Sequence, residues 1–281
     1  MAEISIEALV KELLSYINHH LDGDISLERL SKLSGYSPFY LHRKFKSEIG
    51  HSLRDFIIHQ RIETAAYLLT LTTVPISQIK HLVGYETASS FNKAFKKVMG
   101  VSPKAFRTSN NYLEAVHHVP KSEYLSLNYE LIQLPSRNAI VFPSVGNYFH
   151  RKIYQVWGDV KQYLDVNDLR EDQFDYLAIL HSCQNITPDL PGRYDAVIVP
   201  KPGTKLEANR FFQTQVPGGK FIKYRFCASA EDFQRLSLVI GKHMESQGIV
   251  HGQGISYLAF HTLPDPDHPD NLLTDWYMPV E

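Results

Sequence analysis

The sequence predicts two domains, a helical N-terminal domain and an α+β C-terminal domain. Up to about residue 108, apolar residues recur at helical spacing, whereas from about residue 125 the chain carries β-branched and aromatic runs broken by proline and glycine. Helical stretches near 149–164 and 231–246 interrupt these runs, which is typical of an α+β domain. We therefore predict a helical domain over 1–110, a linker over 111–124 and a second domain over 125–281.

The composition predicts a globular protein without disulfide bonds or membrane spans. Hydrophobic residues make up 43% of the 281 residues, and no apolar run approaches the roughly 18 residues that a membrane helix requires. The two cysteines, Cys183 and Cys227, do not make a disulfide framework, so we expect a cytoplasmic protein without a secretory leader. The first 110 residues carry 14 Lys and Arg against 10 Asp and Glu, and the remainder carry 15 against 20. An anion-binding surface is therefore expected in the first domain.

Start and stop signals define the helices of the N-terminal domain. Ser26 is a typical N-cap, and Gly35 follows the end of the helix that Ser26 begins. Ser37-Pro38 begins the next helix, with proline at the first helical position, where its missing N–H has no cost. Further helices are predicted over 52–71, 75–83 and 87–99.

The helical domain contains two copies of one motif. Gly35-Tyr36 and Gly84-Tyr85 each follow a short helix and precede a basic helix, with one extra residue in the second turn. A glycine able to adopt the left-handed conformation between two crossing helices is typical of a helix-turn-helix motif. The second helix of such a motif reads base edges and contacts phosphates. The alternative is a helical bundle whose charged faces are only solvated. Two copies of the motif in the same register favour the helix-turn-helix interpretation over this alternative.

Residues 5–108 resemble the DNA-binding domain of the AraC/XylS family over its whole length. The resemblance rests on the Gly-Tyr turns, on the Phe-Lys-x-x-x-Gly segments that begin at Phe45 and Phe95, and on the closing Ser-Pro-x-x-Phe-Arg over 102–107. It implies seven helices, with two recognition helices joined by a rigid helix over 52–71 and inserted in adjacent major grooves. It also implies double-stranded DNA, a small-molecule effector and RNA polymerase as partners, and a regulator of a family in which activators are more common.

The resemblance assigns DNA contacts to both recognition helices. The residues expected to face bases are Phe39, His42, Arg43, Ala88, Ser89, Ser90 and Lys93. The residues expected to contact phosphates are Lys44, Lys46, Lys96, Lys97 and Arg107. Arg43 is the predicted reader of guanine, since a planar guanidinium reaches O6 and N7 together. Because Ala88 and Ser89 are small, the second helix is expected mainly to hold phosphates.

The C-terminal domain also repeats itself. Residues 134–136, followed by a strand and a helix, match residues 216–218, which a strand and a helix also follow. Further along, Tyr-Leu-Ala over 176–178 matches Tyr-Leu-Ala over 257–259. This repeat predicts two β-α-β-β units related by a pseudo-twofold axis. A cleft between their two helices would be a usual place for a small ligand.

Residues 125–281 resemble the GyrI-like family of small-molecule-binding domains. The resemblance is carried, in order, by Gly-x-Tyr at 146–148, Arg-Tyr-Asp-Ala at 193–196, Val-Pro-Gly-Gly at 216–219 and the ending Thr-Asp-Trp-Tyr-Met-Pro-Val at 274–280. It implies an effector pocket in this domain. The residues expected to line the pocket are Tyr148, Trp157, Tyr194, Tyr257, Leu258, Asp275 and Trp276. For each aromatic residue, the alternative is a purely structural place in the core.

One position departs from this family. Members that bind cationic aromatic drugs carry a buried glutamate where this chain has Leu258. Since a buried cation needs a charge partner, we expect an aromatic or apolar ligand that is neutral or anionic, with Asp275 the first substitute acid to test. The same glutamate is implicated in the hydrolytic members, so an enzyme or scavenger is the less favoured alternative to a ligand-responsive regulator.

Motifs for metals and cofactors are missing from the sequence. Its 14 histidines include no His-Glu-x-x-His, and its two cysteines do not form Cys-x-x-Cys. The chain has no glycine-rich phosphate loop with the strand-to-helix context that such a loop needs. We therefore expect neither a metal nor a cofactor.

Overall fold

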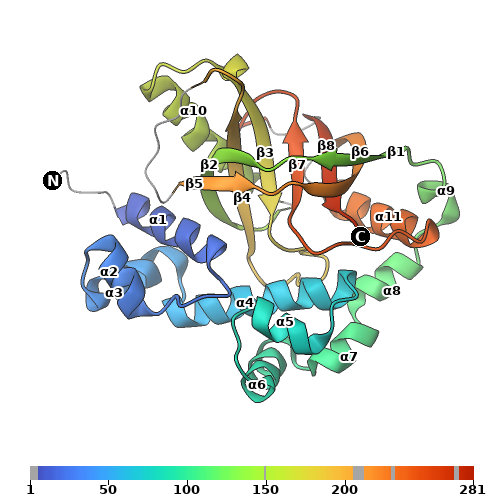
Figure 1. The fold of residues 1–281 in the computed structure, drawn as a ribbon, viewed down its shortest axis with the longest axis horizontal. Helices are drawn as coiled ribbons and strands as arrows, with labels where there is room; N and C mark the ends of the chain where they lie inside the picture. The colour runs from blue at the N-terminus through green and yellow to red at the C-terminus, as the bar shows by residue number, and fades with distance from the viewer. Residues whose placement is uncertain (1–5, 149, 205–211, 229–231, 269–271) are drawn as a thin grey trace. The chain divides into compact units, whose positions relative to one another are not determined.

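The computed structural model describes residues 6–148, 150–204, 212–228, 232–268 and 272–281. These residues form two compact units, which Figure 1 shows in the colours of the chain order. The first unit consists of the residues up to Leu69 together with Val74–Thr108, and the second of Thr70–Thr73 together with Ser109–Glu281.

The described part of the first unit contains seven α-helices, as predicted. They are α1 (Ile6–His19), α2 (Leu27–Ser34), α3 (Pro38–Ile49), α4 (Leu53–Leu71), α5 (Ile76–Leu82), α6 (Ala88–Met99) and α7 (Pro103–Thr108). The pairs α2–α3 and α5–α6 are the two helix-turn-helix motifs. Between them, α4 buries side chains along its whole length and is the central helix of the unit.

Side-chain caps begin the helices where the sequence predicts them. The side chains of Ser26, Ser37 and Thr87 each accept a hydrogen bond from a backbone N–H in the first turn of the helix that follows. Gly35 and Gly84 both have φ of 76°, the left-handed region that favours glycine. Local sequence signals are therefore sufficient to define both motifs.

The second unit is built on an eight-stranded antiparallel sheet (Figure 1). Its strands are β1 (Tyr129–Leu134), β2 (Arg137–Gly146), β3 (Phe174–Leu180), β4 (Gly192–Pro200), β5 (Gln213–Val216), β6 (Gly219–Ala228), β7 (Ser256–Phe260) and β8 (Leu272–Pro279). Their order across the sheet is β1-β6-β8-β7-β3-β4-β2-β5. Two longer helices, α10 (Val156–Val166) and α11 (Asp232–Ser246), pack on it, and short 3-10 helices lie over Arg151–Gln155 and Glu171–Gln173.

The predicted β-α-β-β repeat is confirmed as β2-α10-β3-β4 and β6-α11-β7-β8. β1, which precedes the first repeat, pairs with β6 of the second repeat. β5, which precedes the second repeat, pairs with β2 of the first. The two matched Pro-containing loops meet, since the N–H of Gly218 donates to the Ser136 hydroxyl over 3.0 Å. A Cβ at Gly218 would lie 2.5 Å from the carbonyl oxygen of Leu134, so the loop contact requires glycine.

The register of the central strands shifts the predicted internal match by one residue. Asp195 of β4 pairs with Ile179, and Asp275 of β8 pairs with Ala259. Superposing the two β-α-β-β repeats on these aspartates matches Leu258 with Ala178 rather than with Leu177. Because side chains alternate between the faces of a strand, this single residue decides which face each side chain occupies.

The sheet has a buried core on each face. The helix-side core contains residues of α10 and α11 together with strand residues such as Tyr194 and Leu258. The opposite-face core contains alternate strand residues such as Leu177, Val197 and Tyr257. The two sets follow the period of two along each strand.

The segment predicted as a linker over 111–124 is part of the second unit. It forms α8 (Asn111–His117) and α9 (Lys121–Tyr124). Val119 and Tyr124 are buried against Val239 of α11, and the Glu123 carboxylate accepts two hydrogen bonds, of 2.6 and 3.0 Å, from the guanidinium of Arg235. The sequence suggested a linker because these short helices are separated by proline and polar residues.

His251 provides a pH-dependent term in the stability of this unit. Burial lowers the pKa of the His251 imidazole to about 4, because the charged form loses its hydration. An unfolded histidine titrates near about pH 6.5, so below that pH the unfolded chain takes up a proton that the folded unit excludes. The free energy of unfolding is therefore expected to have its highest value with respect to this histidine above about pH 6.5, and to fall by about 2 kcal/mol between about pH 7 and pH 5.

Urea unfolding followed by tryptophan fluorescence measures this dependence, since both tryptophans, Trp157 and Trp276, lie in the second unit. His251→Gln should lose most of the decrease at low pH. His268→Gln, at an exposed site, should retain it. An unaltered pH profile in His251→Gln would show that another group controls this behaviour.

Candidate DNA interface and effector site

The outer face of α3 presents an exposed row of aromatic and basic side chains. Phe39 is 75% exposed, and His42, Arg43 and Lys46 are also exposed. The Arg43 guanidinium lies 5.9 Å from the centre of the Phe39 ring, a cation–π arrangement. These two side chains, which sequence reasoning assigned to bases, therefore support each other before any DNA is bound.

The outer face of α6 presents small and basic side chains. Ala88, Ser89, Lys93, Lys96 and Lys97 are exposed. Ser90 differs from these exposed side chains, because its hydroxyl donates to the carbonyl oxygen of the N-cap residue Thr87 over 3.0 Å. That hydroxyl belongs to the helix cap, which leaves the lysines as the principal polar groups of this face.

The side chain of Ser90 is thus held by the helix cap, and two further residues predicted to contact DNA, Lys44 and Arg107, also interact with other groups of the protein. Lys44 is half-buried, with its ammonium 5.6 Å from the centre of the Tyr40 ring. The Arg107 guanidinium donates to the carbonyl oxygens of Leu69 and Val74, over 3.3 and 2.5 Å. With its Nε and Nη2, Arg107 therefore joins α7 to the end of α4 and to the segment before α5, and its contact with a phosphate stays a prediction.

Arg61 is a functional candidate that the sequence analysis missed. It lies in the middle of α4 and donates hydrogen bonds to backbone carbonyls of the loop before the first helix-turn-helix motif and of the turn of the second motif. A groove of about 1200 Å³ opens beside it, lined by residues of both motifs, among them His42 and Tyr85. The signal that could have found it is an arginine in the middle of a helix whose neighbours along the chain, from Phe56 to Leu69, include no other basic residue than histidine.

In the second unit, Tyr148, Trp157 and Tyr194 form one buried group of the helix-side core. The indole Nε1 of Trp157 donates to the Tyr194 hydroxyl over 3.1 Å, and the Tyr148 hydroxyl donates to the carbonyl oxygen of Arg193. Burial raises the pKa of the Tyr194 hydroxyl well above its usual value, so it stays protonated. These three rings pack between α10 and the sheet.

Leu258 and Trp276 lie in the same helix-side core, at the centre of the sheet. Leu258 pairs with Ala178 on one side and with Trp276 on the other. The Trp276 ring stacks on Phe233 of α11, with ring centres 4.4 Å apart. Five of the seven residues predicted for the effector pocket therefore share one core.

Tyr257 and Asp275 lie on the opposite face, so the structure does not group them with the other five. Tyr257 belongs to the opposite-face core, where it stacks on Tyr277 with ring centres 4.9 Å apart. Asp275 lies within β8, on the same face of the strand as Tyr277, and is 5% exposed. Asp275 is therefore a buried residue within a strand, and not an exposed residue at its start.

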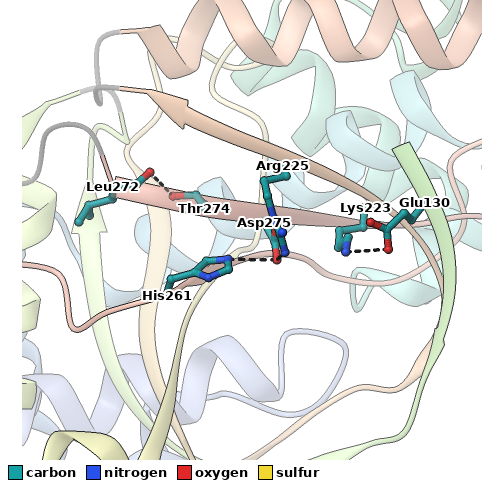
Figure 2. Close-up of polar contacts among 7 residues, drawn as sticks. All are labelled: Glu130, Lys223, Arg225, His261, Leu272, Thr274 and Asp275. Atoms are coloured by element: carbon teal, nitrogen blue, oxygen red, sulfur yellow. Dashed lines mark hydrogen bonds and ion pairs between the residues drawn. The ribbon is translucent and has the colours of Figure 1, made fainter. Parts of the chain in front are cut away.

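Asp275 is neutralised by basic neighbours (Figure 2). Its two carboxylate oxygens accept hydrogen bonds of 2.6 and 2.9 Å from the Arg225 guanidinium, and the His261 ring nitrogen lies 3.3 Å away. Burial by itself would raise the pKa of the Asp275 carboxyl, but the hydrogen bonds and charges of Arg225 and His261 lower it below its usual value. Asp275 is thus a paired carboxylate.

The pseudo-twofold repeats this histidine–aspartate pair. His181 and Asp195, equivalent to His261 and Asp275, lie 2.6 Å apart, and their side chains are 7% and 0% exposed. The buried carboxylates that the structure describes in the second unit are Asp195 and Asp275. Both lie on the sheet face opposite Leu258, so neither takes the place of the glutamate that Leu258 replaces.

The described part of the chain offers neither a metal site nor a membrane span. There, no three or more histidine, cysteine or acidic side chains come together as a group able to hold a metal ion. None of the described helices has the length and apolar character needed to cross a bilayer.

Both units match known domain families. Residues 30–109 match a helix-turn-helix domain, and residues 127–281 match the GyrI-like small molecule binding domain. The multiple antibiotic resistance protein MarA of Salmonella typhimurium is 32% identical over 111 residues, which are 40% of this chain and 87% of that protein. The right origin-binding protein of Escherichia coli is 26% identical over 161 residues, which are 54% of this chain.

The match with the right origin-binding protein spans 56% of that relative, so the chain covers about half of its length. Among solved structures, the C-terminal domain of AraT, a response regulator from Geobacillus stearothermophilus, is 38% identical and covers 39% of this chain and 89% of that chain, with a TM-score of 0.36. The match to the GyrI-like domain spans more than half of the chain, and the match to MarA spans most of MarA. The chain therefore belongs to the AraC/XylS family of transcription regulators and carries a GyrI-like small-molecule-binding domain.

Proposed function

We propose that this protein is a ligand-responsive transcription regulator that binds specific DNA sequences with α3 and α6. The observation that carries the proposal is the presence of two exposed basic second helices in one unit, joined through α4, with Leu41 and Phe45 of α3 and Phe91 and Phe95 of α6 buried beneath them. A regulator of this kind acts in the cytoplasm of a bacterial cell, with RNA polymerase as its partner.

The two recognition helices take different shares of the DNA contact in this proposal. Phe39, His42 and Arg43 reach base edges from α3, and Phe39 meets a thymine methyl group or a sugar. On α6, Lys96 and Lys97 hold phosphates, which position the protein without selecting a sequence. Ala88 and Ser89 are small enough to let the helix approach the base edges closely.

Arg43→Ala tests the base-reading role of α3. Removing a bidentate contact to guanine is expected to cost about 1–3 kcal/mol of specific binding and to relax the preference at one base pair. Lys96→Ala is the matched control, since loss of one phosphate contact should weaken binding to all sequences and reduce the salt dependence by about 0.9 in the logarithmic slope.

The measurements are binding isotherms at several salt concentrations on a duplex selected by the intact protein and on its single-base variants. Arg43 is not a base reader if Arg43→Ala lowers specific and non-specific affinity by the same factor.

The second unit is proposed to bind a neutral or anionic ligand of aromatic or apolar character. Leu258 supplies an apolar group at the centre of the helix-side core, and the two buried carboxylates of the opposite face are each held by a histidine. Tyr148, Trp157 and Trp276 would contribute apolar contact and stacking to such a ligand. A ligand without a positive charge needs no buried carboxylate partner, and the helix-side core around Leu258 therefore suits such a ligand.

A further inference from the structure

Arg61 joins the loop that leads into the first helix-turn-helix motif to the turn of the second motif, through backbone carbonyls. Its Nε donates to the carbonyl oxygen of Leu21 over 2.9 Å, and its Nη2 to that of Gly23 over 2.9 Å. Its Nη1 donates to the carbonyl oxygen of Gly84 over 3.0 Å. Leu21 and Gly23 lie in the loop that leads into the first motif, whereas Gly84 is the turn glycine of the second.

The guanidinium is held on a second side by an aromatic ring. Its central carbon lies 5.7 Å from the centre of the Tyr85 ring. Burial lowers the pKa of the Arg61 guanidinium, but an arginine remains charged at neutral pH, so all three hydrogen bonds are charge-assisted. The planar fork of an arginine is suited to such a fixed set of acceptors.

Gly84 shows that the turn of the second motif is pressed against the loop that leads into the first. A Cβ at Gly84 would lie 2.6 Å from the carbonyl oxygen of Leu21 and 2.7 Å from the Arg61 guanidinium. At Gly35, the equivalent turn glycine of the first motif, a Cβ would meet nothing within 4 Å. The fold of a single motif therefore does not require this contact, which joins the second motif to the loop that leads into the first.

We propose that Arg61 is a positioning residue that sets the distance and rotation between α3 and α6, and so the half-site spacing that the protein accepts. This inference rests on the proposed DNA-binding function. Inserting one base pair moves a half-site by about 3.4 Å and rotates it by about 35° around the duplex. Two recognition helices held rigidly by Arg61 cannot follow such a shift together.

Arg61→Lys in the full-length protein tests the inference, because lysine keeps the charge but cannot present a fork to three carbonyls. The probes are duplexes that carry both half-sites at the spacing selected by the intact protein, or with one base pair inserted or removed, and each half-site alone. The unmodified protein is expected to lose about tenfold in affinity at an altered spacing, and Arg61→Lys less than about threefold. Both should bind the single half-sites within about twofold of each other. Arg54→Lys, at an exposed position of α4, should retain the spacing dependence of the unmodified protein.

A variant that weakens binding by the same factor at every spacing would overturn the inference and leave Arg61 a merely structural role. If circular dichroism shows that Arg61→Lys does not fold, Gly84→Ala and Gly35→Ala replace it, since both strain a left-handed residue but only Gly84→Ala displaces the contact. Gly84→Ala should then broaden or shift the spacing profile and Gly35→Ala should not, and equal profiles would overturn the inference. Failure of the unmodified protein to select any sequence would instead contradict the proposed function.

Discussion

Replacing the four lysines that are predicted to contact phosphates by glutamine is expected to weaken DNA binding about 10³-fold at about 0.1 M salt. These lysines are Lys44, Lys46, Lys96 and Lys97. Each phosphate contact releases counterions from the duplex, so four lost contacts should reduce the slope of log K against log salt by about 3.6. Specific and non-specific duplexes should lose affinity together, because phosphates carry no sequence information.

A control with the same change in net charge separates this effect from a general loss of attraction. Lys121, Lys152, Lys161 and Lys201 are exposed on the second unit and can be replaced by glutamine in the same way. That variant should keep most of its affinity and its salt slope. An equal loss in both variants would mean that net charge, and not the recognition helices, drives the interaction.

Leu258→Glu is expected to convert the second unit into a weaker fold with a greater affinity for cationic ligands. Leu258 is 3% exposed and lies between Ala178 and Trp276, so a carboxyl at this position loses its hydration. Without a ligand, its pKa should rise by about 2–4 units, which corresponds to a destabilisation of about 3–5 kcal/mol when it is ionised. A bound cation would restore the ionised form, so the affinity for cationic aromatic dyes should increase by at least about tenfold.

Leu258→Gln is the matched control, since glutamine has the size and polarity of glutamate without its charge. Both variants and the unmodified protein are titrated with cationic, neutral and anionic aromatic compounds, with the fluorescence of Trp157 and Trp276 as the signal. The unmodified protein should prefer the neutral or anionic compounds. Tight binding of cationic dyes by the unmodified protein would contradict the proposed ligand chemistry, and Asp275→Asn would then test whether that acid has taken the role.

The recognition face of the first unit could be predicted from the sequence because its signals are local. Caps at Ser26, Ser37 and Thr87 and apolar residues at helical spacing act within a few residues, so they determine the helices and the exposed side of α3 and α6 before any long-range contact forms. The repeated Gly-Tyr turns added the relation between the two motifs. The residues that contact DNA remain predictions that the experiments above test.

The sequence by itself thus determined the helical and α+β division, the two recognition helices and the β-α-β-β repeat. Only the tertiary structure decided that Tyr257 and Asp275 lie on the face opposite Leu258, because a strand assigns faces by register and a shift of one residue reverses them. It also decided the contrast between two arginines: Arg61 joins the loop that leads into the first motif to the turn of the second, and Arg107 joins α7 to α4. Their hydrogen-bond acceptors are backbone carbonyls 23 to 40 residues away, and no local pattern encodes a carbonyl that folding brings into reach.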